Sequence, residues 1–492
     1  MKFKEMLREK ILVYDGSKGY LLMQKGLAPG DYPDMWNLDY PDAVSDIHKA
    51  YVGAGADVIQ TNTLQSSRFH LEARGLYERL ADINQAGVEL AKKAAGGKAL
   101  VAASIGPLGG IMAPFGDTGF DDAYAAFSEQ IKVLLAVGVD ILHFETFTDL
   151  SELRIAVLAA KDIDKFAPLI ATISIERGGR TVMGDSAACA AASLAMLGVD
   201  CAGANCGLPP AELLANFNPF AAFHAPLCSK PNAGTPIVDG KTVNYGATED
   251  EFYETAFGFA RLGARLIGGC CGSGPRHVQS IRKAADIMNA DSAYEYSRVV
   301  MGAAGQGDLI ELCSHGRSAV FSRSALAEYM GEALAGAADM PPQRGGGSPR
   351  FIESGDGKML TVDLTGLHNE INVNRSRPDV DKIVEILSDA SESDADATIF
   401  MLRSGYDGSA AAGAGIGEGA GHDSNAACLL GMLAENARAY HNKPLLFHAG
   451  DMGALDKALR HYCGVPAILL AKSDAKRGGP AIDLMQPAVI EF

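Results

Sequence analysis

Short apolar runs alternate with longer amphipathic stretches up to about residue 290, and polar loops rich in glycine, asparagine, threonine and proline separate them. A short apolar run followed by helical periodicity predicts a strand and then a helix. The runs that predict strands are Ile11–Tyr14, Asp57–Gln60, Leu100–Ala103, Ile141–Phe144, Leu169–Ile175, Val199–Ala204, Leu227–Lys230 and Leu266–Gly269.

The stretches between these runs predict helices, the clearest being Asp122–Val137, Leu150–Ala160, Ala187–Leu197 and Glu249–Leu262. Strands that alternate with helices favour parallel pairing, and eight such units in about 290 residues fit a (β/α)8 TIM barrel. A doubly wound sheet is the alternative α/β fold. We therefore expect residues 1–290 to form a TIM barrel whose functional residues follow its strands.

The periodic pattern is lost over residues 291–350, where Met340–Pro349 has the proline and glycine content of a linker. A smaller α/β pattern over residues 351–492 predicts a second domain, whose role the pattern does not specify. Its predicted strands are Met359–Leu364, Thr398–Leu402, Leu445–Ala449 and Ala467–Leu470, and its predicted helices lie near Asp379–Leu387, Ala426–Ala439 and Leu455–Tyr462. Gly415–Ala420 fits a nucleotide-binding glycine motif loosely, but the strand before it ends too early, which favours a surface loop.

The composition limits the classes of partner. A formal net charge of −17 argues against a nucleic-acid surface, which needs a basic face. No uninterrupted apolar run reaches the ~18 residues of a membrane helix, and the charged stretch Met1–Lys10 does not read as a signal peptide. Nine irregularly spaced cysteines do not predict a disulfide framework. We expect a cytoplasmic protein that binds neither nucleic acid nor membrane.

Two adjacent thiols, Cys270 and Cys271, follow the last predicted strand between glycines, and Pro275 then opens a helix. Cys206 follows an earlier strand in the same way. The carboxyl ends of barrel strands share one face, so these three thiols can meet there and hold a zinc ion with its fourth position free. The alternative is a set of reduced core cysteines, since free cysteine is among the most buried residue types.

Polar residues follow the other predicted strands: Asp15, Asn62, Ser104, Glu145 and Asn232. Asp15 and Glu145 are isolated carboxylates at the expected barrel mouth, and each is as compatible with a loop cap or a salt bridge as with a ligand. His143 and His277 read as structural residues of the barrel wall and of a turn.

These residues resemble the homocysteine S-methyltransferase family over about residues 10–285. The resemblance is carried by Gly268–Pro275 with its paired cysteines, by Gly203–Cys206 and by Asp15-Gly16. Within the family, Ser229–Pro236 and Asp239–Val243 are most similar to the homocysteine-binding barrel of cobalamin-dependent methionine synthases, as is Gln60–Thr63. The resemblance implies an enzyme that transfers a methyl group to the thiol of homocysteine and forms methionine.

The resemblance also implies residue roles. The family's zinc ligands fall on Cys206, Cys270 and Cys271, and Asn232 is the candidate for an oxygen ligand at the vacant zinc position. The acidic residues that hold the substrate fall on Asp15 and Glu145, and we add Asn62 and Ser104 as candidate substrate-binding residues. The chain departs from the family's usual Asp-Gly-Ala-Met-Gly-Thr at Asp15–Tyr20, where Lys18 places a cation near the substrate loop.

The methyl donor is inferred from a missing motif. The cobalamin signature Asp-x-His-x-x-Gly is absent from the residues after the linker, so we expect a corrinoid (methylcobalamin) on a separate protein partner. S-methylmethionine and betaine are alternative donors. A non-catalytic protein that binds a thiol amino acid, or a barrel with a purely structural zinc ion, is the alternative to an enzyme.

Overall fold

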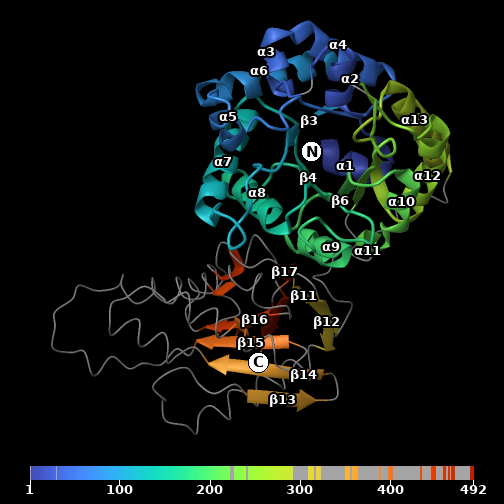
Figure 1. Ribbon diagram of the computed structural model, residues 1–492. Coiled ribbons are helices and arrows are strands. Elements are labelled where there is room, and N and C mark those ends of the chain that lie inside the picture. The colour runs from blue at the N-terminus through green and yellow to red at the C-terminus, as the bar shows by residue number, and fades with distance from the viewer. Residues whose placement is uncertain are drawn as a thin grey trace. The chain divides into compact units, whose positions relative to one another are not determined.

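The structure is a computed structural model that describes residues 2–28, 30–221, 226–239 and 242–291. Beyond residue 291 it describes nine strands, β11 to β19, and the short helical segments 387–388, 433–434 and 458–460 (Figure 1). The chain forms two compact units, and the boundary between them lies near Met301.

The first unit is the expected (β/α)8 barrel, built on a sheet of eight parallel strands in the order β1-β10-β7-β6-β5-β4-β3-β2. A parallel bridge between Tyr14 and Val58 joins the two ends of this sheet. The strands are β1 (Leu12–Val13), β2 (Val58–Gln60), β3 (Leu100–Ile105), β4 (Ile141–Phe147), β5 (Leu169–Ile173), β6 (Cys201–Asn205), β7 (Leu227–Lys230) and β10 (Ala264–Ile267). Each corresponds to one predicted run, which confirms the fold class.

A ring of helices surrounds the strands (Figure 1). The helices are α1 (Lys2–Glu9), α2 (Lys18–Gln24), α3 (Trp36–Asp39), α4 (Pro41–Gly53), α5 (Arg68–Glu72), α6 (Leu80–Ala95), α7 (Phe120–Ala136), α8 (Leu150–Ile163), α9 (Ala187–Met196), α10 (Pro210–Ala215), α11 (Asn218–Ala221), α12 (Glu249–Arg261) and α13 (Pro275–Ala290), with 3-10 turns at Pro33–Met35 and Tyr77–Arg79. The predicted acidic start of α12 carries a capping box in which Thr248 and Glu251 satisfy each other's backbone N–H groups.

Helix α1 closes the amino-terminal end of the barrel. Its apolar residues Phe3 and Leu7 are buried against strand residues such as Leu12, Val58 and Leu266, and Figure 1 shows α1 in the centre of the helical ring. Burying a side chain of this size stabilises the fold by about 1.5–3 kcal/mol. The charged first segment therefore has one apolar face, which fills the bottom of the barrel and leaves the opposite end for chemistry.

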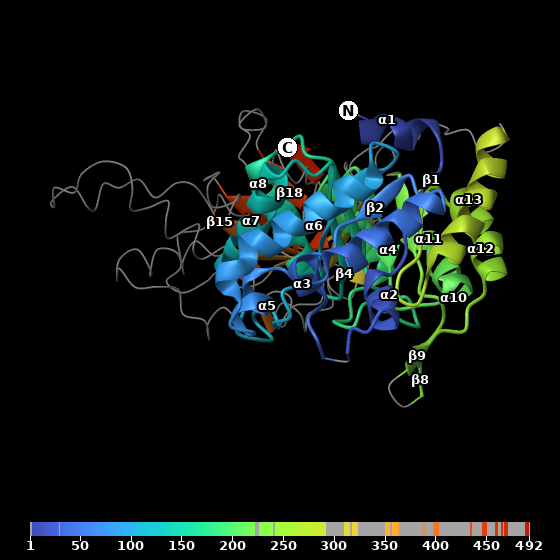
Figure 2. The ribbon, with the colours of Figure 1, turned by 90° about the horizontal axis from the view of Figure 1, so that it is seen from above.

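That opposite end carries the loops that follow the strands. The longest excursion is the hairpin of β8 (Ile237–Asp239) and β9 (Thr242–Asn244), which lies between β7 and α12. Figure 2 shows it projecting from the end of the barrel opposite α1.

The second unit contains two sheets. The six-stranded sheet has the order β13-β14-β15-β16-β18-β19, in which β14 to β19 are parallel and β13 is antiparallel to β14. The three-stranded sheet has the order β12-β11-β17. The strands are β11 (Leu309–Ser314), β12 (Arg317–Ser322), β13 (Arg350–Ser354), β14 (Gly357–Asp363), β15 (Ala397–Leu402), β16 (Leu445–Ala449), β17 (Gly464–Val465), β18 (Ala467–Leu470) and β19 (Ala488–Glu491).

All four strands predicted for this unit are present, as β14, β15, β16 and β18. The paired strands β11 and β12 lie in the stretch 291–350. The sequence predicts a linker there, because short apolar runs in this stretch are not followed by a helical sequence pattern. Most residues of the helices predicted for this unit lie outside the described residues. The same holds for the glycine-rich stretch Gly415–Ala420 and for Met340–Pro349.

Candidate metal and substrate site

Three cysteine sulfurs converge at the carboxyl end of the barrel. Cys206 directly follows the last residue of β6, and Cys270 and Cys271 follow β10. Their Sγ atoms all lie within 4.8 Å of one another, and those of Cys206 and Cys271 are 3.8 Å apart. A zinc ion with Zn–S bonds of about 2.3 Å holds its sulfur ligands roughly 3.8 Å apart in a tetrahedron. The donor set and its spacing therefore fit zinc.

The backbone after β7 holds both cysteine segments in place. The N–H of Cys206 donates to the Lys230 carbonyl oxygen at 3.0 Å, and the N–H of Cys270 donates to the Pro231 carbonyl oxygen at 2.8 Å. Cys206 itself has a φ of 62°, a left-handed conformation that is uncommon for a residue with a side chain. Such strained backbone is found at functional sites, where the surrounding structure compensates for it.

Gly272 lets an aromatic ring approach the paired cysteines. It has a φ of 78°, and a Cβ at this position would lie 2.1 Å from Cγ of Tyr245. The Tyr245 ring therefore packs directly on the Gly272 backbone, and Tyr20 meets it edge-on with the ring centroids 5.4 Å apart. Only a glycine fits between Cys271 and this ring.

Asn232 contacts the same segment. Its amide oxygen accepts a hydrogen bond from the N–H of Cys271 at 3.1 Å, and its side chain is buried. The oxygen predicted as a candidate fourth metal ligand is therefore close to the cysteines and is bonded to their backbone in this structure.

The three thiols shift one another's pKa values. Hydrogen bonds from Cys270 and Cys271 lower the pKa of the Cys206 thiol well below its usual range. The hydrogen bond to Cys206 raises the pKa of Cys271 to about 12, and hydrogen bonds with the other two thiols raise that of Cys270. A metal that binds all three sulfurs must displace the remaining protons.

Three further cysteines, Cys189, Cys201 and Cys228, are buried, and the last two belong to the apolar cluster at the bottom of the barrel. Cys428 and Cys463, which read as core residues in the sequence, lie outside the described residues.

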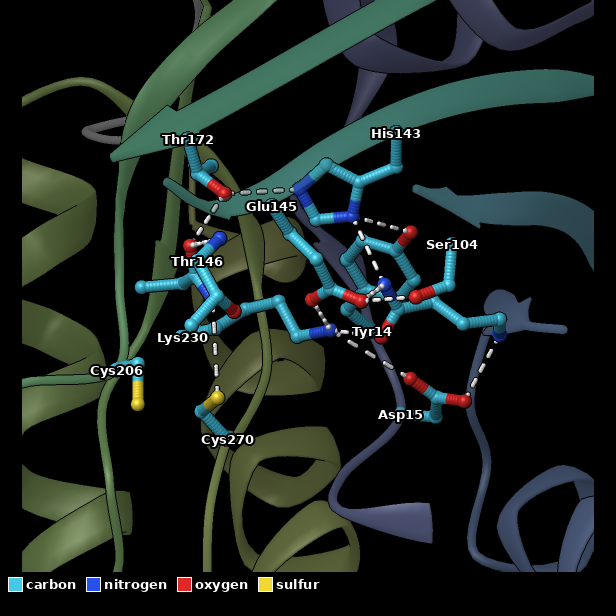
Figure 3. A network of polar contacts seen from close by, with 12 residues as sticks. Tyr14, Asp15, Ser104, His143, Glu145, Thr146, Thr172, Cys206, Lys230 and Cys270 are labelled. Carbon is cyan, nitrogen blue, oxygen red and sulfur yellow. Dashed lines mark hydrogen bonds and ion pairs between the residues drawn. The ribbon is translucent and has the colours of Figure 1, made fainter. Parts of the chain in front are cut away.

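A buried charge cluster lies beside the cysteines (Figure 3). The ammonium of Lys230 is 3.6 Å from Oε2 of Glu145 and 3.8 Å from Oδ1 of Asp15. It also lies 4.1 Å from the centre of the Tyr14 ring and is 1% exposed. Lys230 thus lies between the two carboxylates to which the family resemblance gives a substrate-binding role.

Uncharged groups complete this cluster. The Gln60 backbone N–H donates to Oδ2 of Asp15 at 2.8 Å, and the Gln60 side-chain amide donates to Oε1 of Glu145 at 2.6 Å. The Ser104 hydroxyl donates to the same Glu145 oxygen at 2.5 Å. The Gln60 side-chain oxygen in turn accepts from Lys230 and, at 3.2 Å, from Lys18.

The lysines determine the charge state of Glu145. Burial alone would raise the pKa of this carboxyl, but Lys230 first, and also His143 and Lys18, bring it down to about 2. Burial raises the pKa of Asp15 against the opposing effect of Lys18 and Lys230. Burial opposes the charge of Lys230, yet the two carboxylates raise its pKa above the usual value. The cluster therefore holds Lys230 and Glu145 as an ion pair.

A chain of hydrogen bonds connects the charge cluster to the cysteines. His143 contacts the Tyr14 hydroxyl at 2.9 Å and the Thr172 hydroxyl at 3.0 Å. Thr172 donates to the Asn205 amide oxygen at 2.6 Å, and the Asn205 amide nitrogen lies 3.6 Å from Sγ of Cys270. Burial lowers the pKa of His143 to about 3, so the ring is neutral.

Both predictions of structural histidines are confirmed. His143 is a buried wall residue whose ring nitrogens both have partners. His277 accepts the Gly274 N–H at 3.0 Å and so caps the start of α13.

Two predicted strand-end residues lie inside their strands. β4 continues beyond Phe144, so Glu145 falls within it, next to an irregularity in its pairing with β5 and to Thr146, which has a φ of 65°. Such a bulge re-aims a side chain, here toward the charge cluster. Ser104 likewise belongs to β3.

Asn62 lies apart from the charge cluster. Its side chain donates to the Pro33 carbonyl oxygen at 2.8 Å and to the Asn37 amide oxygen at 3.2 Å. It therefore supports the loop after β2, and its role toward a substrate stays a prediction.

Lys230 and Gln60 were not singled out from the sequence as site residues. Each is the last residue of a barrel strand, β7 and β2 respectively. Position at the carboxyl end of a strand was the signal that could have identified them.

In the described part of the chain, no helix has the length and apolar character that a membrane span requires.

Comparisons with known proteins identify relatives of this chain. The chain is 30% identical over 312 residues to a methionine synthase of Mycobacterium tuberculosis and 30% identical over 304 residues to one of Mycobacterium leprae, which covers 59% and 58% of the chain. The chain spans about a quarter of the length of these relatives, 26% and 25%. The solved structure of the metallated homocysteine methyltransferase MmuM from Escherichia coli is 23% identical with a TM-score of 0.46, over 56% of this chain and 96% of that one. The homocysteine S-methyltransferase model matches residues 12–285, more than half of the chain, which therefore belongs to the homocysteine S-methyltransferase family.

Proposed function

We propose that this protein transfers a methyl group to the thiol of homocysteine and forms methionine, and that Cys206, Cys270 and Cys271 hold a zinc ion at the reacting centre. The observation that carries the proposal is the convergence of three sulfurs from β6 and β10 within 4.8 Å at the barrel mouth. Three sulfur ligands leave one tetrahedral position for a substrate, as catalytic zinc sites do.

When bound, zinc would supply a Lewis acid that lets the substrate sulfur lose its proton at neutral pH and remain a nucleophile. The residues of this chain do the rest. Hydrogen bonds from the β7 backbone fix the positions of Cys206 and Cys270, and Asn232 orients the Cys271 backbone. A substrate sulfur bound at a site fixed in this way can face a methyl donor in line, which lowers the entropic part of the activation barrier.

The charge cluster is the proposed site for the amino-acid end of the substrate. Asp15 and Glu145 would accept the substrate ammonium, Ser104 keeps Glu145 in place, and Asn62 supports the loop beside them. Lys230 balances the charge of both carboxylates in the absence of substrate and so opposes their protonation inside the barrel.

The proposed donor is a methyl-corrinoid on a separate protein. The resemblance of Ser229–Pro236 to cobalamin-dependent methionine synthases supports this choice over S-methylmethionine or betaine. We further propose a cytoplasmic location, where the thiols stay reduced, and a division into a barrel domain of residues 1–290 and a separate α/β domain of 351–492. The expected linker of 291–350 joins them and includes the paired strands β11 and β12.

The test mixes the full chain, zinc and homocysteine with a methylated corrinoid protein, free methylcobalamin, S-methylmethionine or glycine betaine, and follows methionine. We expect methionine from the corrinoids. If methionine formed only with S-methylmethionine or glycine betaine, the proposed corrinoid donor would be wrong and the proposed chemistry at the thiol would stand. A protein that binds zinc and homocysteine but transfers no methyl group from any donor would be a binding protein.

A further inference from the structure

Lys18 is a second cation in the substrate region, at a position where the family usually has a methionine. It is the first residue of α2, and its side chain is 11% exposed. Its ammonium lies 3.4 Å from Oδ2 of Asp15 and 3.2 Å from Oε1 of Gln60. An ammonium has three N–H donors, and the described residues provide Lys18 with two oxygen partners.

We propose that Lys18 binds the α-carboxylate of the substrate while Oδ1 of Asp15 accepts its ammonium, so that the site selects zwitterionic α-amino thiols. The inference rests on the proposed function and deepens it by assigning the carboxylate end of the substrate to a residue of this chain.

The first argument is an unused acceptor. Oδ1 of Asp15 is buried and has no hydrogen-bond partner among the described residues. The Lys230 ammonium is 3.8 Å from it, which is beyond hydrogen-bond distance. A buried carboxylate oxygen without a donor is costly and therefore indicates a ligand that supplies one. A substrate ammonium is such a donor.

The second argument is charge balance. The site contains two carboxylates, Asp15 and Glu145, and two ammonium groups, Lys18 and Lys230. A ligand with only an ammonium, or only a carboxylate, leaves one buried charge without a counter-charge, which is unfavourable. A zwitterion adds one charge of each sign and keeps the balance.

The third argument distinguishes the two lysines. Lys230 is 1% exposed, donates to the Gln60 side-chain oxygen and is enclosed by Glu145, Asp15 and the Tyr14 ring, so a ligand has little access to its ammonium. Lys18 is closer to solvent and keeps one donor for a ligand. Lys18 is therefore the ammonium that can reach a substrate carboxylate.

The test measures the binding of three thiols to the zinc-loaded full chain by isothermal titration calorimetry. The thiols are homocysteine, 3-aminopropane-1-thiol, which lacks the carboxylate, and 4-mercaptobutanoate, which lacks the ammonium. Wild-type protein should bind homocysteine at least about tenfold more tightly than either analogue, the scale of one charged hydrogen bond. Equal affinity for homocysteine and 3-aminopropane-1-thiol would overturn the proposal without any variant.

Lys18→Met should weaken homocysteine binding about tenfold and leave the affinity for 3-aminopropane-1-thiol unchanged or higher. Lys25→Met is the matched control, because Lys25 follows the same helix and pairs with Asp46 in a solvent-exposed position. Equal losses for both thiols would mean that Lys18 only holds Asp15 in place, and the assignment would fall. If wild-type protein bound none of the thiols, the proposed function would fall with it, whereas normal homocysteine binding by Lys18→Met would remove this assignment alone.

Discussion

The ammonium of Lys230 lies 3.6 Å from Oε2 of Glu145 in the interior of the barrel, where the two side chains are 1% and 7% exposed. Removing one partner of a buried ion pair is costly because the other charge is left without compensation. Here a single lysine compensates two carboxylates, since Asp15 lies on its other side. The stability of the barrel and the geometry of the proposed substrate site therefore depend on the same side chain.

We predict that Lys230→Met lowers the free energy of unfolding by about 3–5 kcal/mol. Urea denaturation followed by circular dichroism measures the change. The exposed Lys98→Met is the control and should change stability by less than about 0.5 kcal/mol. Adding Glu145→Gln to Lys230→Met should recover part of the loss, because it removes one of the stranded charges. A loss for Lys230→Met no larger than that of the control would contradict the ion-pair role.

Replacing any one of Cys206, Cys270 and Cys271 by alanine should abolish stoichiometric zinc binding, because a site with two sulfurs loses both charge and geometry. The buried Cys189, Cys201 and Cys228 lie outside this cluster, so their alanine variants should keep one zinc per chain. Elemental analysis of the purified variants measures the difference. Similar zinc contents in all six variants would show that the ligand assignment is wrong.

The low pKa of Glu145 predicts a pH-dependent contribution to stability. Its pKa is about 2 in the folded protein, against an ordinary value of 4.5. A lowered folded-state pKa stabilises the protein above the unfolded value, and this stabilisation is lost as pH falls from about 4.5 toward 2. The unfolding free energy of wild type should therefore fall relative to that of Glu145→Gln over this range.

The full difference is on the order of 3 kcal/mol, since each pKa unit corresponds to about 1.4 kcal/mol, and about 2 kcal/mol of it should be lost between pH 6 and pH 3. Urea titrations at pH 6, 4.5, 3.5 and 3 measure it, and subtracting the Glu145→Gln values removes the titration of all other groups. Parallel curves for the two proteins would show that Glu145 has an ordinary pKa.

The fold was predictable because every barrel strand is a short apolar run followed by a helical pattern. The proximity of Cys206 and Cys270 could be predicted from the sequence alone, because residues that end parallel strands of a barrel share one face. The position of Lys230 could not be inferred in the same way. A lysine after an apolar run is ordinarily solvent-exposed, and only the three-dimensional placement of Asp15 and Glu145 explains why this one is buried.

Loop geometry was a second limit. The irregularity in β4 turns Glu145 toward the cluster from inside the strand, and apolar periodicity carries no signal for it. The hairpin of β8 and β9 was also absent from the predicted pattern, because its strands are short. Both features lie at the mouth of the barrel, outside the packed core whose apolar residues produce the sequence pattern.

Gly272 is the position where an added methyl group should damage the site most directly. Alanine there must adopt a φ of 78° and place its Cβ 2.1 Å from the Tyr245 ring. Gly97 is a matched control, because it has a φ of 76° and open space where its Cβ would lie. Gly97→Ala should lose about 1–2 kcal/mol of stability from backbone strain alone, and Gly272→Ala about 2–5 kcal/mol because overpacking adds to that strain.

Zinc affinity, measured by competition with a chelator, should fall only in Gly272→Ala, since Cys271 must move. Combining Gly272→Ala with Tyr245→Ala removes the clash and should restore zinc affinity; equal stability losses at the two glycines, or no rescue, would show that the ring does not position the paired cysteines.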